Sequence, residues 1–222
     1  MSRVAKLQKQ LPHRIIPLPC EDKLFHEDPI KLESNLADLP HPFRCLLLGS
    51  PNYGKSTIIK TLVMHQSPPF DTITVVHCDP NTQEYSKLTT GVQTHMPFLD
   101  DFDKDKKNLV IIDDVALKSL DKKEKARCDR LLGNWSTHSN ISCCVASQQP
   151  QAVPPNVRRQ CNFFCLWRST DYQSLRDIAE KCGCNSDTLR YILGLLQDSH
   201  DSLMIDLVSN YKYRKNIWEH IQ

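Results

Sequence analysis

The chain has 222 residues, of which 40% are hydrophobic and 24% charged, and its formal net charge is +2. A chain of this length forms one domain with at most a small appendage, and its apolar content excludes full disorder. No uncharged apolar run approaches the ~18–20 residues that cross a bilayer, and the first residues lack the apolar stretch of a signal peptide. We therefore expect a soluble, intracellular protein without a membrane span.

The ten cysteines do not indicate a disulfide scaffold, because the chain is long and lacks a secretion signal. They also do not form paired C-x-x-C units, and Cys161 and Cys165 lie at and within an apolar run. Cysteine is among the residue types most often buried. We therefore expect reduced thiols in the core rather than zinc ligands.

The pattern along the chain divides it into three parts. Residues 1–42 carry six of the 14 prolines; because proline fixes φ and removes a hydrogen-bond donor, this part is expected to be an extended N-terminal arm. Residues 43–208 alternate short apolar segments with segments of helical length, which predicts the folded domain. Residues 209–222 form a tail that combines basic and aromatic residues.

Within the domain, the apolar runs predict strands and the longer amphipathic segments predict helices. The expected strands are 43–48, 72–77, 108–113, 141–146, 163–167 and 202–208. The expected helices are 55–65, 121–135, 171–181 and 186–197. The mixed charges at 100–107 indicate a solvated loop. This order predicts the α/β class, with a mostly parallel sheet flanked by helices.

A phosphate-binding motif follows the first predicted strand. The segment Gly49-Ser-Pro-Asn-Tyr-Gly-Lys-Ser56 satisfies G-x-x-x-x-G-K-[ST] and opens a predicted helix, which is the context that a P-loop, or Walker A motif, requires. Glycines let successive N–H groups face a phosphate, and the helix N-terminus adds partial positive charge. Lys55 is expected to reach the β- and γ-phosphates of a nucleotide, and Ser56 to offer its hydroxyl to Mg²⁺. The predicted nucleotide-binding residues are Gly49, Ser50, Pro51, Asn52, Tyr53, Gly54, Lys55, Ser56 and Thr57.

A second strand carries the acidic residues that a P-loop site needs. The run Leu109-Val-Ile-Ile-Asp113 is a buried strand that closes on a carboxylate, so Asp113 is predicted to be the Walker B ligand of Mg²⁺. Asp114, the next residue, is placed to polarise the attacking water. The segment between Lys55 and Asp113 leaves room for a strand between the two motif strands. That insertion is expected of the additional-strand, catalytic-acid (ASCE) division of P-loop ATPases.

A polar amide ends the next strand and is a third candidate for the site. A glutamine at this position, Gln148 in preference to Gln149, can contact the γ-phosphate or orient water. Two rival P-loop chemistries lack their signatures: no N/T-K-x-D motif indicates a GTPase, and no arginine-rich lid indicates a small-molecule kinase. The remaining interpretation is an ATPase that uses Lys55, Asp114 and Gln148 in catalysis.

The order of motifs resembles a known family. Gly49–Thr57, Leu109–Asp114, Thr137–Ser142 leading to Gln148, and Pro154–Arg158 leading to the next strand look like the genome-packaging ATPases of large double-stranded DNA viruses, virophages and related transposons. That group belongs to the FtsK–HerA superfamily of DNA-pumping motors. The resemblance covers residues 43–208, and many relatives in the wider superfamily have Glu where Asp114 stands.

The resemblance implies a homo-oligomeric ring, with a hexamer as the expected size, that uses ATP to thread double-stranded DNA into a preformed capsid. ATP and Mg²⁺ are then the cofactors, and the partners are DNA, a capsid or portal-vertex protein and further copies of the chain. It also implies an arginine finger from the neighbouring subunit, for which Arg127, Arg130, Arg158 and Arg159 are candidates. The protein is expected inside the infected host cell, in its cytoplasm or nucleus, or in the virion.

Contact with DNA is carried by weaker signals. Residues 211–215 of the tail combine cations with aromatic rings, which suits phosphate contact and stacking. The N-terminal arm could dock to a capsid vertex or to a neighbouring subunit. Two other interpretations stay open: another oligomeric nucleic-acid ATPase, such as a helicase or its loader, and a nucleotide-gated assembly or scaffold protein.

Overall fold

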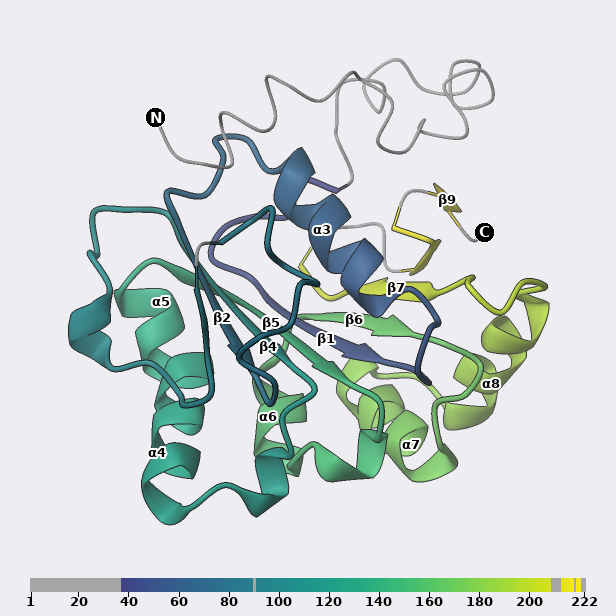
Figure 1. Ribbon diagram of the computed structural model, residues 1–222. Coiled ribbons are helices and arrows are strands. Elements are labelled where there is room, and N and C mark those ends of the chain that lie inside the picture. Colours follow the sequence, from purple (N-terminus) through teal and green to yellow (C-terminus); the bar gives the residue numbers. More distant parts are fainter. Residues whose placement is uncertain (1–36, 90, 209–212, 218, 221–222) are drawn as a thin grey trace.

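The computed structural model describes residues 37–89, 91–208, 213–217 and 219–220. A mixed sheet of nine strands, in the order β3-β2-β4-β5-β1-β6-β7-β8-β9, forms the centre of the molecule (Figure 1). The strands are β1 (Arg44–Leu48), β2 (Thr72–His77), β3 (Val92–Gln93), β4 (Asn108–Asp113), β5 (Ile141–Ser147), β6 (Phe163–Leu166), β7 (Leu203–Asp206), β8 (Tyr213–Lys215) and β9 (Glu219–His220). The helices are α3 (Lys55–His65), α4 (Lys122–Arg130), α5 (Ser136–His138), α6 (Pro155–Gln160), α7 (Tyr172–Cys182) and α8 (Ser186–Leu195).

The strands β1 to β6 pair in parallel, whereas β7, β8 and β9 are antiparallel to their neighbours. The predicted α/β fold with a mostly parallel sheet is therefore confirmed. β5 lies between β1 and β4, which is the additional strand that the ASCE division requires. This strand comes from the chain after Asp113. The segment between Lys55 and Asp113 instead supplies β2 and β3, which lie on the far side of β4.

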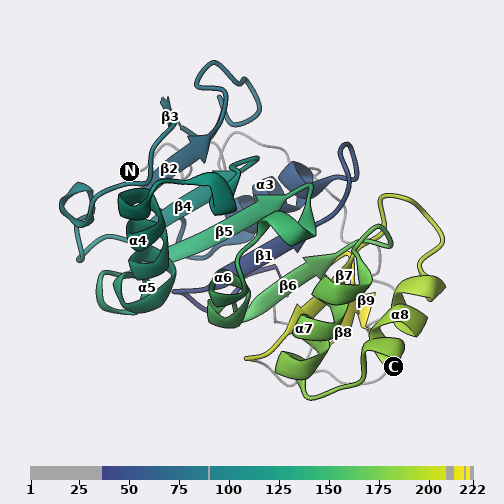
Figure 2. The same ribbon diagram turned by 90° about the horizontal axis from the view of Figure 1, so that it is seen from below.

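Helices cover both faces of the sheet. α3 packs on one face, and α4 to α8 lie on the other, as both views show (Figure 1, Figure 2). The strand residues alternate between the two cores because successive side chains of a strand point to opposite faces. In β1, Cys45 and Leu47 join the core under α3, whereas Leu46 and Leu48 join the core under the other helices.

Local signals in the sequence set the helix ends. The Asp121 side chain accepts hydrogen bonds from two backbone N–H groups at the start of α4, and the Asp171 side chain accepts one, from Ser174, at the start of α7. Gly183 ends α7 in the left-handed conformation. The single helix expected at 121–135 is instead α4 followed by a π-helical turn at Leu131–Trp135, because Gly133 leaves helical geometry.

Segments on both sides of residues 43–208 contribute to the fold. Ala37 and Leu39 are buried in the core under α3, although they belong to the proline-rich region. At the other end, β8 adds to the sheet, and its Arg214 forms a buried ion pair with Asp206 at 2.6 Å. Residues 1–36 of the predicted arm and half of the predicted tail (209–212, 218 and 221–222) lie outside the described residues.

Nine of the ten cysteines lie in the part of the chain that the structure describes, and all nine are free thiols. Seven are buried, as predicted from their residue type, while Cys184 is half-buried and Cys78 is exposed. Burial raises the pKa of Cys161 to about 12, so this thiol stays protonated at neutral pH. Among the described helices, none is long and apolar enough to cross a membrane.

Candidate nucleotide-binding site

The P-loop joins the end of β1 to α3, as the motif predicted. Its first glycine, Gly49, has no space for a side chain, because a Cβ atom there would lie 2.9 Å from the Trp167 ring. Its last glycine, Gly54, has φ of 94° and serves as the N-cap of α3. Asn52 also has positive φ, at 64°. The loop therefore needs glycine at 49 for packing and at 54 for backbone conformation.

Lys55 is the first residue of α3 and is 7% exposed. Its ammonium group donates hydrogen bonds to the carbonyl oxygens of Gly49 and Ser50, both at 2.8 Å. Burial lowers the pKa of Lys55, while the charges of Asp113 and Asp114 raise it. The P-loop thus encloses a cation that faces both acidic residues at the end of β4.

Asp113 ends β4 and is buried at 7% exposure. Its Oδ2 atom accepts a hydrogen bond from the Tyr85 hydroxyl at 2.7 Å. Burial raises the pKa of Asp113, but this hydrogen bond, His77 and Lys55 lower it. The Ser56 hydroxyl also interacts with the Tyr85 oxygen. Ser56 and Asp113, the two predicted ligands of Mg²⁺, therefore both interact with one phenol group.

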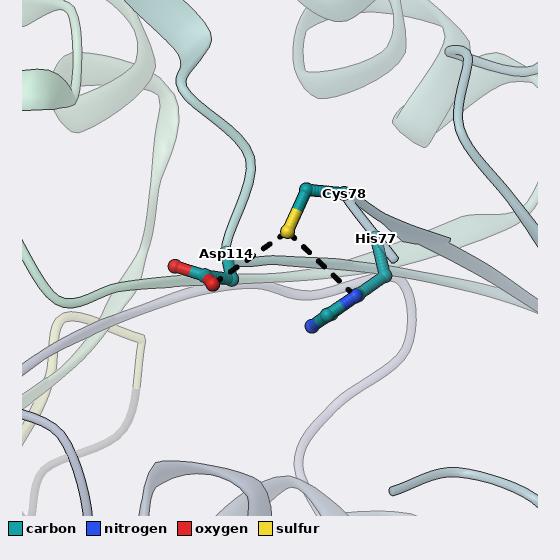
Figure 3. A group of neighbouring side chains, drawn as sticks. All are labelled: His77, Cys78 and Asp114. Carbon is teal, nitrogen blue, oxygen red and sulfur yellow. Dashed lines mark hydrogen bonds between the residues drawn. The ribbon is translucent and has the colours of Figure 1, made fainter. Parts of the chain in front are cut away.

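Asp114 follows β4 in the left-handed conformation, with φ of 54°, and its side chain is exposed. Asp and Asn adopt this conformation more readily than other non-glycine residues. The Cys78 thiol donates to Asp114 Oδ2 at 3.6 Å and lies 3.9 Å from His77 Nδ1, so the three side chains form a group at the ends of β2 and β4 (Figure 3). Asp114 is thus oriented by the neighbouring strand while remaining open to solvent.

The donor atoms distinguish two places where a cation could be held. Ser56 and Asp113 offer hard oxygen atoms, which are the ligands that Mg²⁺ prefers, so the predicted residues fit that ion. One ligand atom from each of His77, Cys78 and Asp114 lies within 4.8 Å of the others, but nitrogen and sulfur donors suit softer metals.

Gln148 follows β5, so it lies at the end of the strand between the two motif strands. Its side chain is exposed, as is that of Gln149. Ser147 supports this turn: its hydroxyl donates to the Gln149 carbonyl at 2.9 Å and accepts from the Gln149 amide at 3.2 Å. Gln148 thus lies at the end of the strand between β1 and β4, and its role as a sensor stays a prediction. The bonds to Ser147 involve only the backbone of Gln149.

The structure separates the four arginine-finger candidates. Arg158 is buried and contacts Ser174 at 3.0 Å and Asp177 at 3.2 Å within the same chain. Arg127 pairs with Glu124 and lies over the Phe98 ring at 4.3 Å. Both guanidinium groups are therefore engaged by contacts within the chain. Arg130 and Arg159 have exposed side chains.

The predicted DNA-contacting segment, 211–215, is described only from Tyr213. Arg214 is 2% exposed and pairs with Asp206, so it cannot contact a ligand outside the sheet. Lys215 pairs with Asp201 at 3.1 Å. The other two residues, 211 and 212, lie outside the described residues. Both described cations of this segment, Arg214 and Lys215, therefore form ion pairs within the fold.

A hollow of about 370 Å³ is lined by residues that follow β6 in the chain, from Arg168 to Gly194. Arg168, Tyr172 and Arg190 line it, and the Arg190 guanidinium lies 5.6 Å from the centre of the Tyr172 ring. Two hydrogen bonds connect its wall to the P-loop region: Thr170 Oγ1 donates to the Leu48 carbonyl at 3.1 Å, and the Ser50 amide donates to Ser169 Oγ at 3.0 Å.

Sequence reasoning did not identify Tyr85, His77, Cys78 or Tyr172 as part of this region. The only signal for His77 and Cys78 was their place at the end of a predicted strand, where parallel strands bring ligands together. Tyr85 lies in the polar segment after β2, and no sequence spacing relates it to Asp113. Its contact depends on how that segment packs against the sheet.

The fold and these motifs define the class of P-loop NTPases. No family model and no curated protein sequence matches the chain. Solved structures do share its fold. The genome-packaging NTPase B204 from Sulfolobus turreted icosahedral virus 2, in complex with ATPγS, matches with a TM-score of 0.57 and 17% identity, over 80% of this chain and 97% of that chain.

Two other P-loop structures share the fold more distantly. The cytoplasmic domain of the Type VII secretion ATPase EccC from Thermomonospora curvata has a TM-score of 0.52 and 11% identity, over 80% of this chain and 25% of that one. The pCW3 conjugation coupling protein TcpA, with ATPγS, has a TM-score of 0.51 and 13% identity, over 82% and 61%. The shared fold includes almost the whole length of B204 but only part of the larger proteins.

Proposed function

We propose that the protein is an ATPase that translocates double-stranded DNA and packages viral DNA into a preformed capsid. One observation carries the ATPase part: Lys55 and Ser56, which open α3 after the loop from β1, lie close to the acidic end of β4 formed by Asp113 and Asp114. β5 lies between β1 and β4 in the sheet. The packaging part is supported by the fold shared with B204, a genome-packaging NTPase. The shared fold covers nearly the whole length of B204.

The residues of this edge divide the work of hydrolysis. Lys55 turns from the loop carbonyls to the β- and γ-phosphates, and the P-loop amides bind the phosphate oxygens. Ser56 and Asp113 hold Mg²⁺, which neutralises charge on the phosphates when bound. Asp114 accepts a hydrogen bond from the attacking water and orients it. Gln148 contacts the γ-phosphate and reports its loss to the adjoining strands.

We infer the direction of the bound nucleotide from the order of the strands in the sheet. The γ-phosphate lies toward Asp113, on the β4 side of β1. The ribose and base then extend to the opposite side, where β6 ends and the hollow lined by Tyr172 and Arg190 begins. The Tyr172 ring and the Arg190 guanidinium both line that hollow, and groups of both kinds stack on base faces.

The motor is a homo-oligomeric ring, with a hexamer as the expected size, in which each site receives an arginine from the neighbouring subunit. Arg130 and Arg159 are the candidates that remain, because their side chains are exposed. Basic groups from all subunits line one channel and bind DNA phosphates without reading sequence. The ring docks to a capsid or portal-vertex protein inside the infected cell.

The test is ATP hydrolysis by the full chain, with and without long duplex DNA, at several protein concentrations. Lys55→Ala and Asp114→Asn are compared with Lys87→Ala, which changes an exposed lysine remote from the P-loop in sequence. We expect duplex DNA to increase the rate per subunit, because hydrolysis is coupled to movement on DNA. We also expect the rate per subunit to rise with protein concentration, because the arginine comes from a neighbouring subunit. The two site variants should lose turnover while Lys87→Ala keeps it.

Other outcomes identify the other candidate functions. A preference for single strands together with strand separation would indicate a helicase or its loader. ATP binding with weak hydrolysis that ignores duplex DNA at every concentration would refute an autonomous motor and favour a nucleotide-gated assembly protein. Full turnover by Lys55→Ala would refute the assigned site itself.

A further inference from the structure

The Tyr85 hydroxyl lies at the meeting point of the two motifs, although Tyr85 belongs to neither. It donates a 2.7 Å hydrogen bond to Asp113 Oδ2 and also interacts with the Ser56 hydroxyl. We propose that Tyr85 is a positioning residue for the metal site: it holds the Asp113 carboxylate and the Ser56 hydroxyl in the orientation that binds Mg²⁺. This inference rests on the proposed function of the same site.

The packing of Tyr85 fixes the position of its hydroxyl. The side chain is fully buried in the core under α3. Lys60 of α3 lies 5.7 Å from the centre of its ring and pairs with Glu84, the neighbouring residue. The backbone carbonyl of Tyr85 accepts hydrogen bonds from the backbone N–H groups of Leu88 at 2.9 Å and Thr89 at 3.1 Å. Contacts to the backbone, the ring and the hydroxyl of Tyr85 therefore all restrict where its phenol group lies.

Core packing alone does not require the hydroxyl. A phenylalanine would fill the same space, and burying an unbonded hydroxyl costs free energy, so the group is explained by what it contacts. With Oδ2 held by Tyr85, the direction of the other Asp113 oxygen, Oδ1, is also set. Such groups contact a metal ligand and not the metal itself, and losing one weakens metal binding by about 10–100-fold.

The arrangement also connects the two motifs mechanically. Ser56 lies on α3 and Asp113 on β4, and the segment that carries Tyr85 is tied to α3 through the Lys60–Glu84 pair. A shift of α3 relative to β4 would thus change both ligands together. Tyr85 makes the metal geometry depend on the packing of residues 80–89 against α3.

The test compares Tyr85→Phe with two controls in the full chain. Binding of Mn²⁺, as a probe for Mg²⁺, is followed by electron paramagnetic resonance with a non-hydrolysable ATP analogue present, and Mg²⁺ is titrated as competitor. Tyr191→Phe removes a hydroxyl from a side chain that is 70% exposed. Leu88→Ala loosens the same segment, because Leu88 packs in the same core, but keeps the phenol.

We expect Tyr85→Phe to weaken Mn²⁺ and Mg²⁺ binding by about 10-fold or more, while affinity for the nucleotide without metal stays unchanged. Tyr191→Phe should bind the metals like the wild type. Leu88→Ala should lose stability, measured by urea unfolding, with a smaller change in metal affinity than Tyr85→Phe shows. These results would separate positioning from a purely structural role.

Three outcomes would overturn the inference. Unchanged metal affinity in Tyr85→Phe would show that the hydroxyl orients nothing, and tighter binding would show that it competes with the metal. Equal losses in Tyr85→Phe and Leu88→Ala would assign the effect to packing. If the wild type itself binds no metal–nucleotide complex, the proposed function fails first, so the two failures are distinguishable.

Discussion

The Trp167 ring packs directly against the backbone of Gly49, the first glycine of the P-loop. A Cβ atom at Gly49 would lie 2.9 Å, 3.0 Å and 3.1 Å from three atoms of that ring. The ring cannot easily move away, because Trp167 is fully buried and its Nε1 atom donates to the His200 carbonyl at 3.2 Å. We therefore predict that Gly49→Ala destabilises the protein.

The magnitude follows from two opposing effects. Carbon atoms in contact normally lie about 3.5–4.0 Å apart, so the new Cβ is too close by about 0.5–1 Å to three atoms. Overpacking of this kind costs about 1–3 kcal/mol. Replacing glycine with alanine also restricts the unfolded chain, which offsets about 0.4–1 kcal/mol at a compatible backbone conformation. We expect a net loss of about 1–2 kcal/mol.

Urea unfolding followed by circular dichroism measures this loss. Gly194→Ala is the matched control: the added Cβ meets nothing within 4 Å, and the residue lies within α8, so it should stabilise the protein by about 0.5–1 kcal/mol. Trp167→Phe gives the second arm of a double-mutant cycle. Phenylalanine lacks the Nε1 bond to His200, so the smaller ring can shift away from the new Cβ. The two changes together should therefore cost less than their sum by about 0.5 kcal/mol or more.

Additive losses, or a Gly49→Ala variant as stable as the wild type, would refute the packing argument. Binding of a fluorescent ATP analogue to the same variants then tests the consequence for function. The double variant should recover nucleotide affinity relative to Gly49→Ala, because the loop returns to its original path. A double variant that binds no better than the single one would show that Gly49 is needed for phosphate approach itself.

Three further predictions follow from other parts of the structure. Asp206→Asn removes the carboxylate charge opposite buried Arg214 and should cost about 3–5 kcal/mol in urea unfolding, whereas Asp198→Asn, in an exposed pair, should cause no measurable loss. Burial lowers the pKa of His41 below 6.5, so the unfolded chain takes up a proton first; the free energy of unfolding should fall as pH decreases through about 6.5, and His41→Gln should reduce that slope. Tyr172→Ala should weaken ATP binding by about fivefold or more through lost stacking and leave tripolyphosphate binding unchanged; equal loss of both would refute a base site there.

Sequence patterns predicted the parts of the fold that depend on local physics. The helix 55–65 and the strand 72–77 were predicted with the bounds that the structure shows, because the P-loop motif and an apolar run define them. The strands β8 and β9 and the short helix α6 were not predicted. They are short, and β8 forms because it pairs with β7 and buries Arg214, which no local pattern indicates.

At the site, too, local motifs were predicted and packing contacts were not. A motif places a side chain at the end of a strand or the start of a helix, since that place follows from the backbone. Lys55, Asp113 and Asp114 were predicted in this way. The availability of an arginine depends instead on what else packs beside it. Arg158 is held by α7 through Ser174 and Asp177, residues 16 and 19 positions later in the chain.

Tyr85 is a packing contact of the same kind, and it acts on Asp113. Asp113 alone is a buried carboxylate, and burial raises its pKa, which opposes the charged form that a cation needs. The phenol that lowers the pKa again comes from a segment with no motif of its own. The strand therefore supplies the ligand, but a distant packing contact supplies the conditions under which it can act. A search for site residues in other P-loop folds should examine which buried hydroxyl faces the last residue of the Walker B strand, since that position is defined in space and not in sequence.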